Sequence, residues 1–195
     1  MEIRILAAAA LAIPAFFLVM RYHMHMFQLN GYKNGEHLNW LRKNLGQQWL
    51  LLFGILLGTV GMILPCMAVD AAVIVTLLLM IVVYRARKRM HTKKKLVYTA
   101  RVKRMVATIL IVTALLLALG GAFLGIRRMT GLFLCAVSVQ FLLNLAANMI
   151  NRPIENSVSR YYINDAKRKL AEVPGLQIIG VTGSYGKTSV KFYLQ

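Results

Sequence analysis

The chain alternates between long apolar blocks and short polar, basic segments, a pattern that predicts an α-helical membrane protein. Apolar blocks close to the ~20 residues that a helix needs to cross a bilayer occupy residues 3–20, 49–66, 68–84, 105–126 and 129–150. The first block could also be a secretory signal. It is long, lacks a clear small-x-small cleavage site and is followed by further blocks, so we interpret it as an uncleaved span. We therefore predict a multi-span membrane region of about five transmembrane helices in residues 1–152.

The polar interval between the first two blocks contains a second helical pattern. Leu38, Leu41, Leu45 and Trp49 recur at helical spacing with charged residues between them. This pattern is typical of a short amphipathic helix lying in the membrane interface, anchored by tryptophans such as Trp40. The alternative is a simple extension of the next span.

Small residues in the second block indicate close helix packing. Gly54 and Gly58 are four residues apart and Gly61 follows one turn later. Small side chains at this spacing let two helices approach closely within a bilayer. Pro65 then separates this block from the next one, so we expect a break in the helix there.

The charge distribution favours a membrane surface as the partner of the basic residues. The 195 residues carry a formal charge of +18 and are 58% hydrophobic. A strongly basic soluble chain would suggest nucleic acid, but here the Lys and Arg residues flank apolar blocks, with ten of them in residues 85–104. This placement is typical of contact with the lipid bilayer and its acidic headgroups, and we expect no nucleic-acid partner.

One apolar block carries a polar stripe. Gln140, Asn144 and Asn148 are four residues apart, which places their side chains on one face of a helix. Amides within a bilayer need hydrogen-bond partners. Hydrogen bonds to neighbouring helices would supply these, and a groove that holds part of a lipid-linked substrate is the alternative.

The last part of the chain has the pattern of a nucleotide-binding unit. We expect a linker helix in residues 153–175, ended by Pro174 and Gly175. The apolar run 176–181 then predicts a buried strand, and a glycine loop and a helix-compatible segment follow it. A strand, a glycine loop and a helix in this order form the P-loop unit.

The residue types in this loop suit the binding of phosphate. Gly183 and Gly186 allow a tight turn and a close approach of the backbone to a ligand, and the loop amides then form a nest for anionic oxygens. Lys187 would reach the β- and γ-phosphates, and the Thr188 hydroxyl would ligate Mg²⁺. The alternative is an ordinary lysine at a helix start. We expect ATP and Mg²⁺ as the ligands and the following residues as the ATP-binding set: Gly183, Ser184, Tyr185, Gly186, Lys187, Thr188 and Ser189.

The loop resembles that of a known family. The general P-loop pattern places a glycine or small residue where this chain has Val181. The run Thr-Gly-Ser-Tyr-Gly-Lys-Thr-Ser-Val-Lys, residues 182–191, is similar to the ATP loop of the Mur ligase superfamily. Within it the run most resembles that of the D-alanyl-D-alanine-adding ligases (UDP-N-acetylmuramoyl-tripeptide:D-alanyl-D-alanine ligases). The resemblance covers about the last 20 residues and implies that residues 176–195 begin a P-loop α/β ligase domain.

The resemblance implies an ATP-dependent amide ligase that acts on a peptidoglycan precursor in the bacterial cell wall. In this family a carboxylate attacks the γ-phosphate of ATP, and an amine displaces phosphate from the resulting acyl phosphate. Carried over by position, Lys187 would be the catalytic residue that neutralises phosphate charge, and Thr188 would hold Mg²⁺. The family's remaining domains would follow residue 195, so we expect the sequence to be the N-terminal portion of a longer enzyme, inactive by itself. Membrane spans in place of the family's uridine-nucleotide domain suggest a membrane-held substrate or cell-wall synthesis partners.

Charge and ATP location predict the same topology. ATP is cytosolic, so a glycine loop after five spans places the N-terminus outside the cell. The segments that would then face the cytoplasm carry 21 Lys and Arg residues and the outer segments carry three. This is the direction of the positive-inside rule, and it predicts a multi-pass protein of the bacterial cell membrane with a cytoplasmic ligase domain.

Two other functions remain open at this point. A poly-γ-glutamate-type synthetase shares the ATP loop and can also be membrane-bound, and the amine substrate would distinguish it from a Mur-type ligase. A non-catalytic membrane anchor or assembly protein with a vestigial loop is the third possibility. The presence of both Lys187 and Thr188 argues against such decay of the loop.

Overall fold

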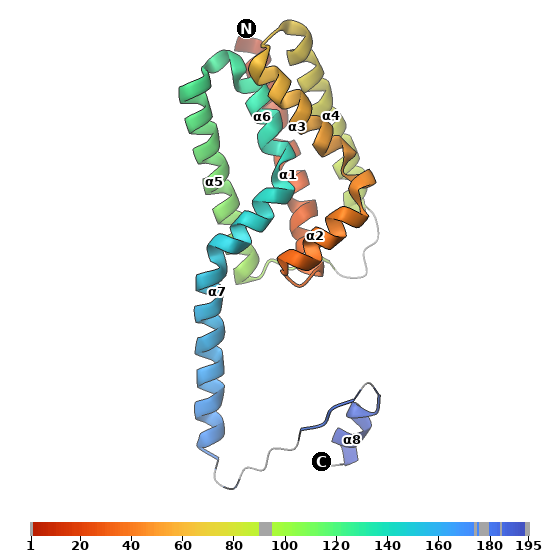
Figure 1. Cartoon of the computed structure of the whole chain (residues 1–195), viewed down its shortest axis with the longest axis vertical. Helices are drawn as coiled ribbons and strands as arrows, with labels where there is room; N and C mark the ends of the chain where they lie inside the picture. Colours follow the sequence, from red (N-terminus) through yellow and green to blue (C-terminus); the bar gives the residue numbers. More distant parts are fainter. Residues whose placement is uncertain (1, 90–94, 174, 176–179, 184, 194–195) are drawn as a thin grey trace. The chain divides into compact units, whose positions relative to one another are not determined.

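A computed structural model describes residues 2–89, 95–173, 175, 180–183 and 185–193. The chain divides into two compact units, Met1–Pro153 and Ile154–Gln195. All of the regular structure in the described residues is helical (Figure 1), and none of them belongs to a β-strand.

The first unit is a bundle of apolar helices with short connections. Its helices in chain order are α1 (Glu2–Leu29), α2 (Asn34–Lys43), the 3₁₀ turn η1 (Leu45–Gln47), α3 (Trp49–Ile63), α4 (Met67–Arg89), α5 (Ala100–Leu124), the 3₁₀ turn η2 (Ile126–Arg128), α6 (Met129–Ser138) and the first part of α7 (Gln140–Ala171). Helix α1 packs against α4 and α6, and α3 packs against α4 and α6.

Within the described residues, three helices are long and apolar enough to cross a membrane, namely α1, α4 and α5. The last apolar block forms a fourth candidate only if α6 and α7 count as one span, because these two helices meet at a bend of 65°. Helix α3 has 15 residues, or about 22 Å at 1.5 Å per residue, against a hydrocarbon core of ~30 Å. The structure therefore supports a helical protein with three to four candidate spans where the sequence predicted about five.

The helix ends differ from the predicted spans in two places. Helix α1 continues nine residues beyond residue 20 to Leu29, because His23, Met24 and Phe27 are buried against the bundle. The last apolar block is interrupted at Val139, next to a hydrogen bond from the Ser138 hydroxyl to the Leu134 carbonyl at 2.7 Å. Such back-bonding by serine bends helices. The predicted break near Pro65 is confirmed, since α3 ends at Ile63 and α4 begins at Met67.

An ion pair closes one end of the bundle. Arg4 of α1 donates to Asp70 of α4 at 2.6 Å, and the Thr130 hydroxyl of α6 donates to the other Asp70 oxygen at 2.7 Å. Asp70 is buried, so both of its oxygens need these partners. The contact joins the ends of three helices. Arg127 and Arg128, which belong to η2, come just before Thr130 in the chain.

Basic residues gather at the opposite end. Arg87 of α4 lies over the rings of Tyr22 and Tyr84 at 5.1 and 4.9 Å. The Arg101 guanidinium of α5 lies 4.3 Å from the Tyr32 ring centroid. From Arg4 to Arg21 in α1, and from Asp70 to Arg87 in α4, the spacing is the same 17 residues, or about 26 Å of helix. The apolar part of the bundle is therefore bounded by charged side chains at both ends.

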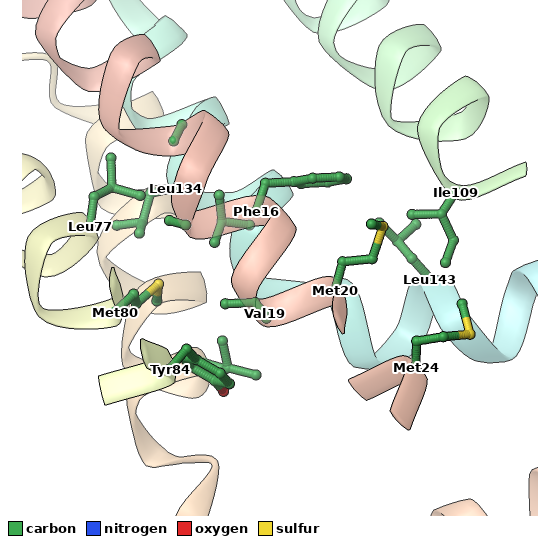
Figure 2. Close-up of a cluster of buried hydrophobic side chains, with 14 of the residues drawn as sticks. Phe16, Val19, Met20, Met24, Leu77, Met80, Tyr84, Ile109, Leu134 and Leu143 are labelled. Atoms are coloured by element: carbon green, nitrogen blue, oxygen red, sulfur yellow. The ribbon is translucent and has the colours of Figure 1, made fainter. Parts of the chain in front are cut away.

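Small and sulfur-containing side chains fill the centre of the bundle. Figure 2 shows Met20 and Met24 of α1 directed toward Ile109 of α5 and Leu143 of α7, while Met80 of α4 lies on the other side of α1. All five are buried. Methionine has the flexibility to fill irregular gaps between helices. Such gaps are expected around the bend between α6 and α7.

The predicted close helix approach is confirmed between α3 and α6. A Cβ added to Gly58 would lie 2.5 Å from the Cys135 sulfur, and one added to Gly131 would lie 2.5 Å from the Gly58 carbonyl oxygen. A Cβ added to Gly61 would lie 3.2 Å from the Gly131 Cα. The two backbones therefore touch, which agrees with the packing of small residues in membrane helix pairs.

The predicted amphipathic helix forms only in part, as α2. The predicted face of Leu38, Leu41, Leu45 and Trp49 is wrong, because Leu45 lies in η1, Trp49 begins α3 and Leu41 alone of the four is buried. Helix α2 instead packs His37 and Trp40 against Phe27 and His23 of α1.

His37 is fully buried, with its ring stacked on Trp40 at 5.4 Å and its Nδ1 atom 3.1 Å from the Asn30 amide nitrogen. Since the Asn30 amide donates, Nδ1 accepts, and the imidazole is neutral. Burial lowers the pKa of His37 from its ordinary value to about 4.

We expect the folded protein to lose stability as the pH falls from 6.5 toward 4. The unfolded chain binds a proton at His37 below about pH 6.5, whereas the folded chain keeps the ring neutral down to about pH 4. The full loss of unfolding free energy that is attributable to His37 is about 3 kcal/mol. Thermal unfolding in detergent between pH 7.5 and 4.5 measures it, and His37→Gln should show a shallower pH dependence than the wild type or His25→Gln. Equal pH dependence of all three proteins would contradict this assignment.

The second unit contains the C-terminal part of α7 and the short helix α8 (Lys187–Tyr193). The sequence predicted a separate linker helix in residues 153–175, but α7 runs without a break from Gln140 to Ala171 with Pro153 inside it. Asp165 pairs with Arg168 and Lys169 one turn later, both at 2.8 Å. These i,i+3 and i,i+4 pairs favour helix in a polar, exposed segment.

Candidate functional site

The glycine loop of residues 180–186 is the candidate functional site, and its backbone has the conformation that only glycine adopts freely. Gly183 has φ of 141° and Gly186 has φ of 77°. An L-residue with a side chain would be strained at either position. The two glycines predicted to allow a tight turn therefore both have positive φ.

Lys187 folds back over this loop. Its ammonium nitrogen donates a hydrogen bond to the Gly183 carbonyl at 2.5 Å. Lys187 is also the first residue of α8, whose first α-helical hydrogen bond runs from the Val190 amide to the Gly186 carbonyl at 2.9 Å. The lysine charge is thus held against the Gly183 carbonyl, at the start of α8.

The other predicted ligand residues surround the same turn. Tyr185, Thr188 and Ser189 are exposed, and the Thr188 and Ser189 amides belong to the first turn of α8. Ser184 lies outside the described residues, as do positions 176–179 of the predicted strand. Gly180 and Val181, the last two positions of that strand, are described and are not in a strand, so an α/β arrangement around the loop is a proposal for this chain.

The donor set of the loop fits a phosphate group with a bound cation. A lysine ammonium and the amides of a tight turn are ligands for anionic oxygens, and a neighbouring threonine hydroxyl can ligate Mg²⁺. No group of three or more His, Cys, Asp or Glu side chains that could hold a metal ion by itself occurs among the described residues. A magnesium ion here would therefore depend on phosphate oxygens as well as Thr188, which is the usual way in which proteins bind it.

The polar stripe of α7 is split between two environments. Asn148 donates to the Asn34 side-chain oxygen at 2.8 Å and accepts from Arg101 at 3.0 Å, so at this position hydrogen bonds to neighbouring segments are confirmed. Gln140 and Asn144 are fully buried at the bend between α6 and α7. The Gln140 side chain has no hydrogen-bond partner among the described residues.

Sequence reasoning missed the buried polar groups near this bend. His23 lies within 6.4 Å of the Trp40, Tyr84 and Phe141 rings and is fully buried. The sequence pattern of residues 21–48 indicates a polar, interfacial segment and gives no reason to expect a buried His23. No local signal distinguishes His23 from an exposed histidine, because its burial depends on three distant helices.

These features define an α-helical chain, with several helices that could lie in a membrane, that carries an exposed glycine loop. Comparison of the chain with protein-family models, with curated proteins and with solved structures found no match. The functional argument therefore depends on the chemistry of the loop and on its sequence.

Proposed function

We propose that this protein is a membrane-anchored, ATP-dependent amide ligase of the Mur type that acts in the synthesis of peptidoglycan precursors. The helices of the first unit would anchor the enzyme in the bacterial cell membrane. The glycine loop would bind ATP in the cytoplasm, and the N-terminus, at the end of the first unit with fewer basic residues, would lie outside. The observation that carries the proposal is the turn itself: positive φ at Gly183 and Gly186 brings the Lys187 ammonium onto the Gly183 carbonyl.

Each residue of the loop has a distinct task in this proposal. The Lys187 ammonium leaves the Gly183 carbonyl and pairs with phosphate oxygens, a stronger, charge-assisted interaction. The amides from Tyr185 to Ser189 donate to the same oxygens, and the Thr188 hydroxyl holds the cation. A bound Mg²⁺ supplies positive charge that offsets the charge on the phosphates. The loop thereby positions the terminal phosphate for attack by a carboxylate.

The charge distribution of the first unit supports the proposed orientation. The end of the first unit closed by Asp70 has three arginines, Arg4, Arg127 and Arg128. The opposite end has at least four, contributed by α1, α2 and α4: Arg21, Arg42, Arg85 and Arg87. Arg4 is also neutralised by its ion pair with Asp70. The excess of unneutralised positive charge therefore lies on one side of the apolar region, as the positive-inside rule requires of a cytoplasmic face.

Phosphate release from ATP by the intact gene product in membranes tests this function. The reaction is run with a muramyl-tripeptide and one of three amines: D-alanyl-D-alanine, glutamate or none. Release that needs both the tripeptide and D-alanyl-D-alanine is the expected result. Release with glutamate alone would replace the proposal with a poly-γ-glutamate-type synthetase. Normal ATP binding without release under any condition would contradict ligase activity and favour an anchoring role.

A further inference from the structure

Two hollows lie end to end along the seam between α1 and α5. The larger, of about 320 Å³, is lined by Ala9, Ala12, Ile13, Phe16 and Phe17 of α1, by Leu110, Thr113, Ala114 and Leu117 of α5, and by Phe133, Ala136 and Val137 of α6. The smaller, of about 230 Å³, is lined by Phe17, Leu18, Met20, Arg21 and Met24 of α1, by Val106 of α5 and by Leu96 and Tyr98 just before it. We call the pair the α1–α5 groove.

The α1–α5 groove is continuous and almost wholly apolar. Phe17 lines both hollows, and its position in α1 lies between the residues of one and those of the other. Among the described lining residues, Thr113 is the only one with a hydroxyl in the larger hollow, and Arg21 is the only charged one in either hollow. The described lining is therefore an apolar trough along α1, α5 and α6 with the Arg21 charge at one end.

The position of Arg21 along α1 places that charge at the level of lipid headgroups. Arg21 is 17 residues from Arg4, about 26 Å along the helix, and these two residues bound an apolar stretch nearly as long as a hydrocarbon core is thick. The larger hollow begins one turn inside Arg21 and continues to Ala9. The apolar part of the groove therefore lies at the depth of acyl chains.

Arg21 is also available for a ligand. Its side chain is exposed, and none of the described residues forms an ion pair or hydrogen bond with it. An arginine guanidinium binds phosphate oxygens through two parallel hydrogen bonds. Tyr98 beside it has the amphipathic ring that proteins place at the membrane interface.

We propose that the α1–α5 groove binds one anionic phospholipid, with an acyl chain in the larger hollow and the headgroup phosphate on Arg21. The apolar lining matches a hydrocarbon chain, and the single arginine matches the phosphate at the depth where a headgroup lies. This site is independent of the glycine loop and of the reaction that the loop supports. The first unit would then retain an acidic lipid without any contribution from the glycine loop.

Native mass spectrometry of the purified protein tests this site, with phosphatidylglycerol or phosphatidylcholine added in detergent. We expect phosphatidylglycerol to bind more tightly than phosphatidylcholine. Arg21→Gln should weaken phosphatidylglycerol about fivefold, the loss expected for one basic side chain near an anionic lipid. Arg42→Gln removes a charge from α2 outside the groove and should have little effect.

A second pair of variants tests the larger hollow. Ala114 is exposed and lines the groove, whereas Ala118, one turn further along α5, is exposed and does not line it. Ala114→Phe should fill the trough and weaken phosphatidylglycerol roughly tenfold, while Ala118→Phe should leave it unchanged. Unchanged thermal unfolding of each variant shows that the fold is intact. Equal affinity for the two lipids, or full retention of phosphatidylglycerol by both Arg21→Gln and Ala114→Phe, would overturn the proposal.

Discussion

Replacing Gly131 by alanine should destabilise the first unit by about 2 to 3 kcal/mol, a large fraction of the stability of most domains. The added methyl group would lie 2.5 Å from the Gly58 carbonyl oxygen and 2.8 Å from the Met62 amide nitrogen. Both are backbone atoms of α3, so no side-chain rotation can relieve the overlap. The two helices must move apart, and the contacts along the whole α3–α6 seam are lost with them.

Gly121→Ala is the matched control for this substitution. Gly121 also lies within a long apolar helix, but its added methyl group would first meet the Met129 sulfur at 3.4 Å, which is an ordinary contact with a flexible side chain. Alanine should be neutral there or stabilise α5 by up to about 1 kcal/mol through its higher helix propensity. Thermal unfolding of the detergent-solubilised protein compares the two. Equal stability of Gly131→Ala and wild type would show that α3 and α6 do not pack backbone to backbone.

Removing the Lys187 ammonium should abolish ATP turnover by the intact protein. In Lys187→Ala no charge remains at the mouth of the turn, where the ammonium now lies on the Gly183 carbonyl. Loss of one group that stabilises charge at a reacting centre costs at least about 100-fold in rate, and ATP affinity should also fall. Phosphate release and the binding of a fluorescent ATP analogue measure the two effects separately.

Lys191→Ala provides the comparison in the same short helix. Lys191 is exposed and lies four residues after Lys187 in α8, so its removal changes the net charge by the same amount and leaves the turn intact. We expect this variant to keep wild-type turnover. If Lys187→Ala bound ATP as tightly as the wild type, the loop would have no nucleotide function and a non-catalytic anchor would be the better description.

Local patterns in the sequence were sufficient for much of the helical architecture. The apolar blocks, the break at Pro65 and the small-residue face of Gly54 and Gly58 each depend on residues close together in the chain. The seam with Gly131 could not be predicted in full because the partner helix is more than 70 residues away in the sequence. The same holds for Asp70, whose partners Arg4 and Thr130 are at least 60 residues away in the sequence.

The bend at Val139 shows a different limit of sequence reasoning. Residues 129–150 are apolar apart from Thr130, Ser138 and the stripe of amides, so composition predicts one straight helix. The bend depends on a local hydrogen bond of Ser138 and on the burial of Gln140 against other helices, and neither leaves a signal in hydropathy. The tight turn of the glycine loop, in contrast, could be predicted from the local sequence, because Gly183 and Gly186 have the positive φ values that such a turn needs.

The equal spacing of charged residues in α1 and α4 determines the bilayer thickness that would match the proposed membrane anchor. About 26 Å of apolar helix is shorter than a hydrocarbon core of ~30 Å. In a membrane of ordinary thickness, the proposed anchor would thin the bilayer beside it or extend the side chains of its terminal arginines toward the surface. This hydrophobic mismatch costs a fraction of a kcal/mol per Å. It would draw shorter-chain lipids to the bundle and disfavour regions of thicker membrane.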